Sequence, residues 1–187
     1  MKESKPEAIK TRVLCVGNEL VRDDGVGVRV GRVLQELELP DHVSVELRRV
    51  IGFELLDELR ADEQLLLVDA SNRGVEPGTT QVLELSDAAQ MAEIPYCCHS
   101  VGLAEILKIA STMFPERVPP KAVIVGVEAR DLENFGLDLT DPVAEALPEA
   151  VDLVLCQLGA SEELRQRGRE AAERWQRREP TVEEVIQ

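Results

Sequence analysis

Acidic and imidazole side chains concentrate at three places in the sequence. Asp23 and Asp24 lie in the glycine-rich segment GNELVRDDGVG, Asp69 ends the apolar run LLLVD, and His99 follows a pair of cysteines. Carboxylate oxygens and an imidazole nitrogen form a ligand set that suits a borderline divalent ion such as Zn²⁺ or Ni²⁺. The sequence therefore indicates a divalent-metal site if the three segments converge on one crevice.

Each of these residues also has a purely structural interpretation. Asp23 and Asp24 could cap the helix that follows them and complement its dipole, and Asp69 could bond its own backbone in a turn. His99 could simply stand at the entry of a helix. The only other histidine is His42, in a turn segment, so an HExxH zinc motif and a three-histidine metal site are both excluded.

Cysteine chemistry is a weaker alternative. Cys97 and Cys98 adjoin His99, and a Cys–His nucleophile would need these side chains to meet in space. Two adjacent cysteines cannot readily bind one ion, and the sequence has no CxxC partner for them, so their role stays open. Cys15 and Cys156 lie in apolar runs, which predicts small buried side chains. The absence of GxSxG, GxGxxG and Gly-Lys-Ser/Thr motifs disfavours a serine hydrolase and a nucleotide-binding protein.

The composition excludes further classes of function. The chain has 187 residues and a formal net charge of −15, which disfavours contact with nucleic acid or with an anionic membrane surface. The first ten residues hold no apolar signal-peptide core. No stretch reaches the roughly 18 apolar residues that a membrane span needs. We therefore expect a soluble cytoplasmic protein.

Hydrophobic periodicity predicts strands that alternate with helices. Apolar or alternating runs predict strands at 11–17, 43–50, 64–70, 79–85 and 122–127. Apolar stripes at helical spacing predict helices at 26–37, 52–60, 99–114 and 141–158. In the last helix, Asp141 is expected to be the N-cap, with Pro142 at the first helical position. This alternation is typical of a three-layer α/β fold.

The same pattern predicts one α/β domain within residues 1–160. Residues 161–187 carry many charges and little apolar surface, which predicts a solvated tail that is helical or disordered. Ligands of open α/β sheets bind beyond the carboxyl ends of the strands, and both the 17–27 segment and Asp69 follow such ends. We expect the first and third strands to be neighbours at the switch point of the sheet.

The ordered motifs resemble those of a known family. The pattern Gly-Asn-x-Leu-x-x-Asp-Asp-Gly-x-Gly at residues 17–27 resembles the signature of the hydrogenase maturation endopeptidases. The family's later landmarks follow in the same order: Val68-Asp69-Ala70, His99-x-x-Gly102-Leu103, Val125-Gly126-Val127-Glu128 and Gly136-Leu137-x-Leu139-Thr140-x-x-Val143. The resemblance covers residues 11–159.

This resemblance implies both a fold and an activity. The implied fold is a twisted, mostly parallel five-stranded sheet flanked by helices on both faces, as in phosphorylase/hydrolase-like proteins. The implied activity is endopeptidase removal of a C-terminal peptide from the nickel-loaded precursor of a nickel-iron hydrogenase large subunit. Asp24, Asp69 and His99 would be the catalytic and metal-contacting residues. The Ni²⁺ would be the substrate's own, and we expect a monomer whose partner is this precursor.

Other functions remain open beside this one. At Arg48–Gly52 the sequence departs from the family's Gly-Gly-Thr-like loop, which leaves the hydrogenase class undefined. A non-catalytic nickel-binding assembly factor or chaperone for the large subunit could use the same acids without cutting. A spore germination protease of the same general fold and a Cys–His hydrolase are more distant alternatives.

Overall fold

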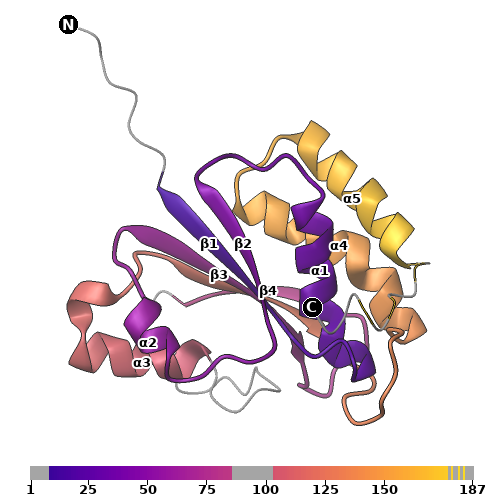
Figure 1. The fold of residues 1–187 in the computed structure, drawn as a ribbon, viewed down its shortest axis with the longest axis horizontal. Helices are drawn as coiled ribbons and strands as arrows, with labels where there is room; N and C mark the ends of the chain where they lie inside the picture. The colour runs from indigo at the N-terminus through magenta and orange to yellow at the C-terminus, as the bar shows by residue number, and fades with distance from the viewer. Residues whose placement is uncertain (1–8, 86–102, 177, 179–180, 182, 184–187) are drawn as a thin grey trace, which may run out of the picture.

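A five-stranded sheet forms the centre of the molecule (Figure 1). The computed structural model describes residues 9–85, 103–176, 178, 181 and 183. The strands are β1 (Lys10–Val16), β2 (Val43–Arg48), β3 (Glu63–Ser71), β4 (Thr80–Glu84) and β5 (Ala122–Glu128). Their order is β2-β1-β3-β5-β4, in which β4 pairs antiparallel with β5 and the other pairs are parallel. The predicted five-stranded, mostly parallel sheet is confirmed.

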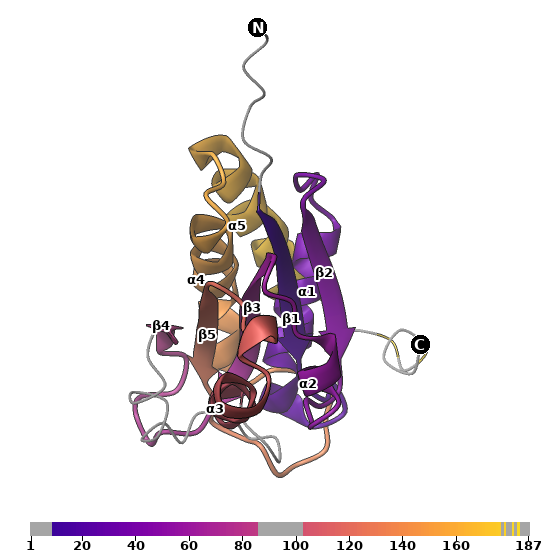
Figure 2. The same ribbon diagram turned by 90° about the vertical axis from the view of Figure 1, so that its left-hand side faces the viewer.

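Helices cover both faces of this sheet, which gives the three layers expected (Figures 1 and 2). They are η1 (Arg22–Gly25), α1 (Val26–Gln35), α2 (Leu55–Glu58), α3 (Leu103–Met113), η3 (Pro115–Arg117), α4 (Asp141–Gln157) and α5 (Glu162–Gln176). Helices α1, α4 and α5 pack on one face, and α2 and α3 pack on the other. Within the described part of the chain, no helix is long and apolar enough to cross a membrane.

Strand β1 is an unbroken apolar run because both of its faces are buried. Val13 and Cys15 belong to the core under α1 and α4, whereas Leu14 and Val16 belong to the core under α2 and α3. Strand β3 alternates between the two cores in the same way. The edge strand β4 has mostly half-buried side chains, which agrees with its predicted position at an edge. Central parallel strands need apolar residues at every position, and this makes them easy to recognise in a sequence.

The start of α1 fits closely against the ends of β1 and β3. A Cβ atom on Gly27 would lie 2.2 Å from the carbonyl oxygen of Val16 and 2.5 Å from that of Val68. Glycine therefore allows the helix to approach the two strand ends more closely than any other residue could. The chain passes from β1 through α1 to β2 on one side, and β3 lies on the other side of β1. This is the predicted switch point between the first and third strands.

Helix α5 belongs to the folded body, which differs from the solvated appendage expected after residue 160. Its buried face consists of Gly168, Ala171, Ala172 and Trp175. The two alanines and Trp175 join the core that α1 and α4 share, and a Cβ atom on Gly168 would lie 2.4 Å from Leu155 Cδ1. The contact face is made of small residues and one indole, so it carries little hydrophobic signal among the surrounding charges.

Three local expectations are corrected by the structure. Helix α4 begins at Asp141 with Thr140 as its N-cap, so the prediction of Asp141 as the N-cap is wrong by one residue. The Cys156 side chain is exposed, not buried. Helix α2 is a single turn and is shorter than the predicted 52–60 helix. Cys15 is fully buried as expected, and burial raises the pKa of its thiol far above the ordinary range.

Candidate active site at the carboxyl edge of the sheet

The loop between β1 and η1 holds the Asp24 side chain in place. Gly17 has a φ of +147°, and a Cβ atom there would lie 1.9 Å from the carbonyl oxygen of Asp24. A Cβ atom on Gly25 would lie 2.8 Å from Glu19 Cα. Within this tight turn, the backbone N–H of Asn18 donates a hydrogen bond to Asp24 Oδ2 over 3.0 Å. The glycines of the motif thus fold the loop back on itself and fix one carboxylate.

Asp69 lies at the carboxyl end of β3, beside this loop. Its side chain is only 2% exposed, and its Oδ1 accepts a hydrogen bond from the Ala70 N–H over 2.8 Å. Across the ladder it faces Gly126 of β5. Because η1 contacts β3 and Gly27 abuts Val68, the elements that carry Asp24 and Asp69 meet at one edge. Burial of a carboxylate is costly unless a polar or ionic partner compensates it. Buried acids at the end of a strand are therefore candidates for functional groups.

Asp23 has a different role from its neighbour. Its carboxylate is fully buried and accepts four hydrogen bonds from the segment after β5. The donors are the N–H groups of Arg130 (2.9 Å), Asp131 (2.9 Å) and Thr140 (2.6 Å) and the Thr140 hydroxyl (2.8 Å). These bonds go to a loop more than a hundred residues away in the chain, not to helix α1. Asp23 therefore ties two loops of the site together, and the proposed helix-capping role is wrong for it.

Glu128 ends a family landmark in the sequence, but it was not predicted to be a site residue. It ends β5, is 1% exposed, and accepts a hydrogen bond from the Ser71 hydroxyl over 2.6 Å. Its other oxygen accepts the N–H groups of Arg73 (2.7 Å), Gly74 (2.7 Å) and Val75 (3.2 Å). One carboxylate thus orders the turn that follows Asp69. The sequence pattern that marks Asp69 also marks Glu128, because each acid directly follows an apolar strand, LLLV for Asp69 and AVIVGV for Glu128.

A buried ion cluster supports the first loop from behind. Glu19 is 5% exposed and forms ion pairs with Arg29 (Oε1 to Nε, 3.2 Å) and Arg32 (Oε2 to Nη2, 2.7 Å). Arg29 also donates hydrogen bonds to the carbonyl oxygens of Leu137 and Arg178. Burial lowers the pKa of Arg29 from its ordinary value, and the negative charge of Glu19 opposes that effect. The cluster links the 17–25 loop, helix α1 and the chain beyond α5.

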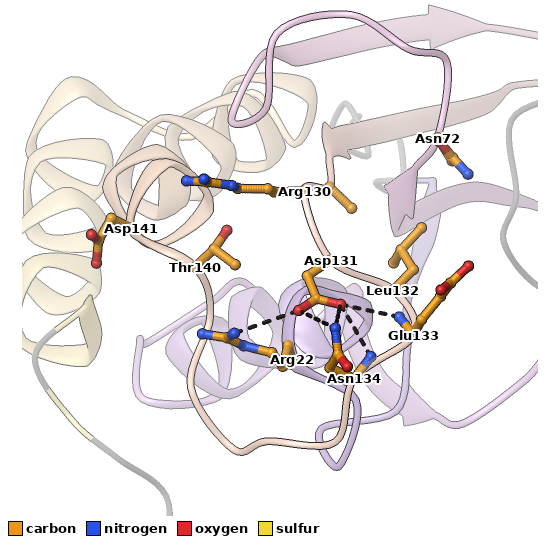
Figure 3. A pocket seen from close by; sticks show the side chains of 10 residues that line it. Arg22, Asn72, Arg130, Asp131, Leu132, Glu133, Asn134, Thr140 and Asp141 are labelled. Atoms are coloured by element: carbon orange, nitrogen blue, oxygen red, sulfur yellow. Dashed lines mark hydrogen bonds and ion pairs between the residues drawn. The ribbon is translucent and has the colours of Figure 1, made fainter.

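An open cleft of about 570 Å³ lies at the same edge of the sheet (Figure 3). Its lining residues are Arg22, Asn72, Ala129, Arg130, Asp131, Leu132, Glu133, Asn134, Thr140 and Asp141. Arg22 has a left-handed φ of 38°, which a non-glycine residue rarely adopts. Its guanidinium forms an ion pair with Asp131 over 3.4 Å. The cleft is polar and has groups of both charge signs.

The third predicted ligand lies outside the described residues. His99, Cys97 and Cys98 belong to the 86–102 segment, and the described chain resumes at Leu103, the first residue of α3. Among the residues that are described, no group of three or more His, Cys, Asp or Glu side chains could hold a metal ion. The structure therefore brings together the elements of Asp24 and Asp69, and the place of His99 stays a prediction.

The fold presents these acids at the carboxyl edge of a parallel sheet, which is where open α/β proteins bind their ligands. A family model described as hydrogenase maturation protease matches residues 28–157. The chain therefore belongs to the hydrogenase maturation protease family, and the peptidase class inferred from the motifs is confirmed.

Relatives and solved structures agree with this assignment. The hydrogenase 2 maturation protease of Escherichia coli is 32% identical over 151 residues, which cover 80% of this chain and 90% of that protein. The hydrogenase expression/formation protein HupD of Rhizobium leguminosarum is also 32% identical over 151 residues, or 79% of this chain and 73% of that one. The structure of the E. coli hydrogenase maturating endopeptidase HybD superposes with a TM-score of 0.66 at 31% identity, over 80% of this chain and 92% of that one.

Proposed function

We propose that this protein is an endopeptidase that removes a C-terminal peptide from the nickel-loaded precursor of a nickel-iron hydrogenase large subunit. Membership of the hydrogenase maturation protease family supports the reaction class. The observation that carries the proposal is the pair of buried carboxylates, Asp24 and Asp69, on adjoining elements at the switch point. Such a position is where open α/β sheets bind their ligands.

The donor set suits an ion that arrives with the substrate. The Asp24 carboxylate accepts a hydrogen bond from the Asn18 N–H, and the Asp69 carboxylate accepts one from the Ala70 N–H, which orients both groups. With the imidazole of His99 they would supply oxygen and nitrogen ligands of the kind that Ni²⁺ accepts. An ion held between the substrate and these residues could polarise the scissile carbonyl or lower the pKa of a bound water. A carboxylate that does not contact the ion could act as general base.

The charge of the chain favours the same partner. The formal net charge is −15, and Asp23, Asp24 and Asp69 place part of it at one edge of the sheet. A negative net charge favours the approach of cations and of positively charged segments of a partner protein. A metal-loaded site on a partner protein meets this description.

The proposal is tested with two forms of one precursor. The purified protein is incubated with nickel-loaded and with metal-free large-subunit precursor, and the intact mass of each is measured over time. We expect the loaded form to lose one C-terminal peptide and the metal-free form to stay intact. Cleavage of both forms at equal rates would contradict nickel dependence. A stable complex that never loses mass would identify a non-catalytic assembly factor instead.

A further inference from the structure

A single aromatic side chain stands exposed on the loop between β5 and α4. Phe135 is 86% exposed, the highest value among the large exposed hydrophobic side chains of the described chain. Phenylalanine is among the residues most often buried in folded proteins. Aromatic residues, phenylalanine included, are enriched where proteins contact one another.

The backbone after Phe135 is fixed to the first loop of the site. The N–H of Gly136 donates a hydrogen bond to the carbonyl oxygen of Leu20 over 3.0 Å, and the N–H of Arg22 donates to the carbonyl oxygen of Gly136 over 3.0 Å. A Cβ atom on Gly136 would lie 3.0 Å from Arg22 Cγ. The two loops therefore form one short parallel bridge beside η1.

The backbone before Phe135 is fixed as well. Asp131 Oδ1 accepts hydrogen bonds from the N–H groups of Glu133 (3.2 Å) and Asn134 (3.1 Å), and the Asn134 side-chain amide donates to both Asp131 carboxylate oxygens (Figure 3). The Asp131 N–H is in turn held by Asp23. Phe135 thus projects from a loop that is ordered on both sides. An aromatic group held in this way loses little conformational entropy when it binds a partner.

The position of Phe135 relates it to the candidate active site. Its neighbour Asn134 lines the polar cleft, and Gly136 bonds to Arg22, which lines the cleft from η1. Arg22 is two residues from Asp24 in the chain. The side chains of the cleft offer donors and acceptors of both charge signs, which suits the alternating N–H and C=O groups of an extended peptide better than a simple anion.

We propose that Phe135 is the docking anchor for the substrate segment that carries the bond to be cut. The extended backbone of that segment lies in the polar cleft, and one apolar side chain of it packs on the Phe135 ring. This inference rests on the proposed function, because it names the hydrogenase precursor as the occupant. Two observations support it. Backbone hydrogen bonds join the Phe135 loop to the Asp24 loop, and hydrogen bonds to Asp131 order the Phe135 loop itself.

The test compares Phe135→Ala with the matched variant Met113→Ala. Met113 is 64% exposed and ends α3, outside the cleft lining. We expect Phe135→Ala to raise KM for precursor cleavage by about tenfold, the size of a typical anchor effect, with kcat within about twofold of the wild type. Phe135→Leu, which keeps most of the apolar surface, should restore most of the affinity. Met113→Ala should leave both constants unchanged, and all variants should keep the wild-type Tm.

Several outcomes would overturn the anchor. An unchanged KM in Phe135→Ala, or a loss confined to kcat, would exclude a docking role. A wild-type dimer that Phe135→Ala converts to a monomer would make a second copy of this chain the occupant instead. If the wild type cuts no precursor, the proposed function fails, and direct binding then decides the anchor. The double variant Asp69→Asn with Phe135→Ala is then compared with the single variant Asp69→Asn. Weaker precursor binding by the double variant would support Phe135 as the docking anchor, and equal binding by the two would overturn that role.

Discussion

Asp23 and Asp24 are adjacent in the chain, but their carboxylates face different partners. The Asp24 carboxylate accepts a hydrogen bond from the Asn18 N–H of its own loop, whereas the Asp23 carboxylate accepts four from the loop after β5. Residue type and spacing marked Asp23, Asp24 and Asp69 as candidates, and the family resemblance then singled out Asp24 from the adjacent pair. The bonds of Asp23 could not be predicted, because its partners lie more than a hundred positions away and become neighbours only in the folded sheet.

Replacement of Asp23 by alanine should destabilise the fold. Three backbone N–H groups and one hydroxyl would lose their acceptor in a buried region, so we expect a loss of about 2–4 kcal/mol in the free energy of unfolding. Urea unfolding followed by circular dichroism measures this loss. Asp141→Ala is the matched control, because Asp141 is an exposed aspartate at the start of α4. It should lose less than about 1 kcal/mol, and equal losses in both variants would contradict the buried role of Asp23.

At the scale of elements, the close approach of α1 to the ends of β1 and β3 sets the geometry of the site. Gly27→Ala would place a Cβ atom within 2.5 Å of two carbonyl oxygens, so the helix must move away or the strands must separate. We expect a loss of roughly 1–3 kcal/mol in stability together with slower precursor cleavage. Gly126→Ala is the control, because its nearest contact would be an ordinary 3.4 Å. A Gly27→Ala variant as stable and active as this control would show that the close approach is not required.

The elements also show where prediction from sequence reaches its limit. The central strands were recognised because burial on both faces requires apolar residues throughout. Helix α5 was expected to be solvated, because its contact face is built from Gly168, two alanines and Trp175 rather than from large aliphatic residues. Short side chains carry little hydropathy, yet they allow a helix to pack closely on α4.

Trp175→Ala should show that α5 belongs to the cooperative fold. The indole is 7% exposed, its Nε1 donates a hydrogen bond to Glu36 Oε1 over 2.8 Å, and the Arg178 guanidinium lies 4.4 Å from the ring centroid. Loss of this packing should reduce the free energy of unfolding by about 3–5 kcal/mol. Arg167→Ala, which removes an exposed ion pair with Glu38, should change stability by less than about 1 kcal/mol. Equal losses in the free energy of unfolding for Trp175→Ala and Arg167→Ala would show instead that α5 is solvated.

At the scale of the whole molecule, the free energy of unfolding depends on pH through carboxylates whose pKa changes on folding, and Glu58 is one of them. The side-chain hydrogen bond from Arg48 lowers the pKa of Glu58 from its ordinary value of 4.5. A lowered folded-state pKa adds stability above the unfolded-state pKa, and this stability is lost as the pH falls through the folded-state value. We therefore expect the wild type to lose stability more steeply than Glu58→Gln below about pH 4.5. Parallel stability curves for the two proteins would contradict this coupling.

Several elements that are distant in the sequence meet at the carboxyl edge of the sheet. The switch point positions Asp24 and Asp69, Asp23 joins the first loop to the loop after β5, and that loop presents Phe135 beside the cleft. Family membership supplies the reaction class, and we propose that the precursor docks and is cut at this edge of the folded body. The proposed function therefore depends most on whether the Asp24 and Asp69 carboxylates act in cleavage.

Intact-mass measurement of a nickel-loaded precursor after incubation with the wild type, Asp24→Asn and Asp69→Asn tests this claim most directly. The amide variants keep the shape of each side chain and remove its charge. We predict that the wild type releases one C-terminal peptide and that each variant is slower by at least about a hundredfold, with a circular dichroism spectrum like that of the wild type. Cleavage at the wild-type rate by either variant would contradict the site proposed for this protein.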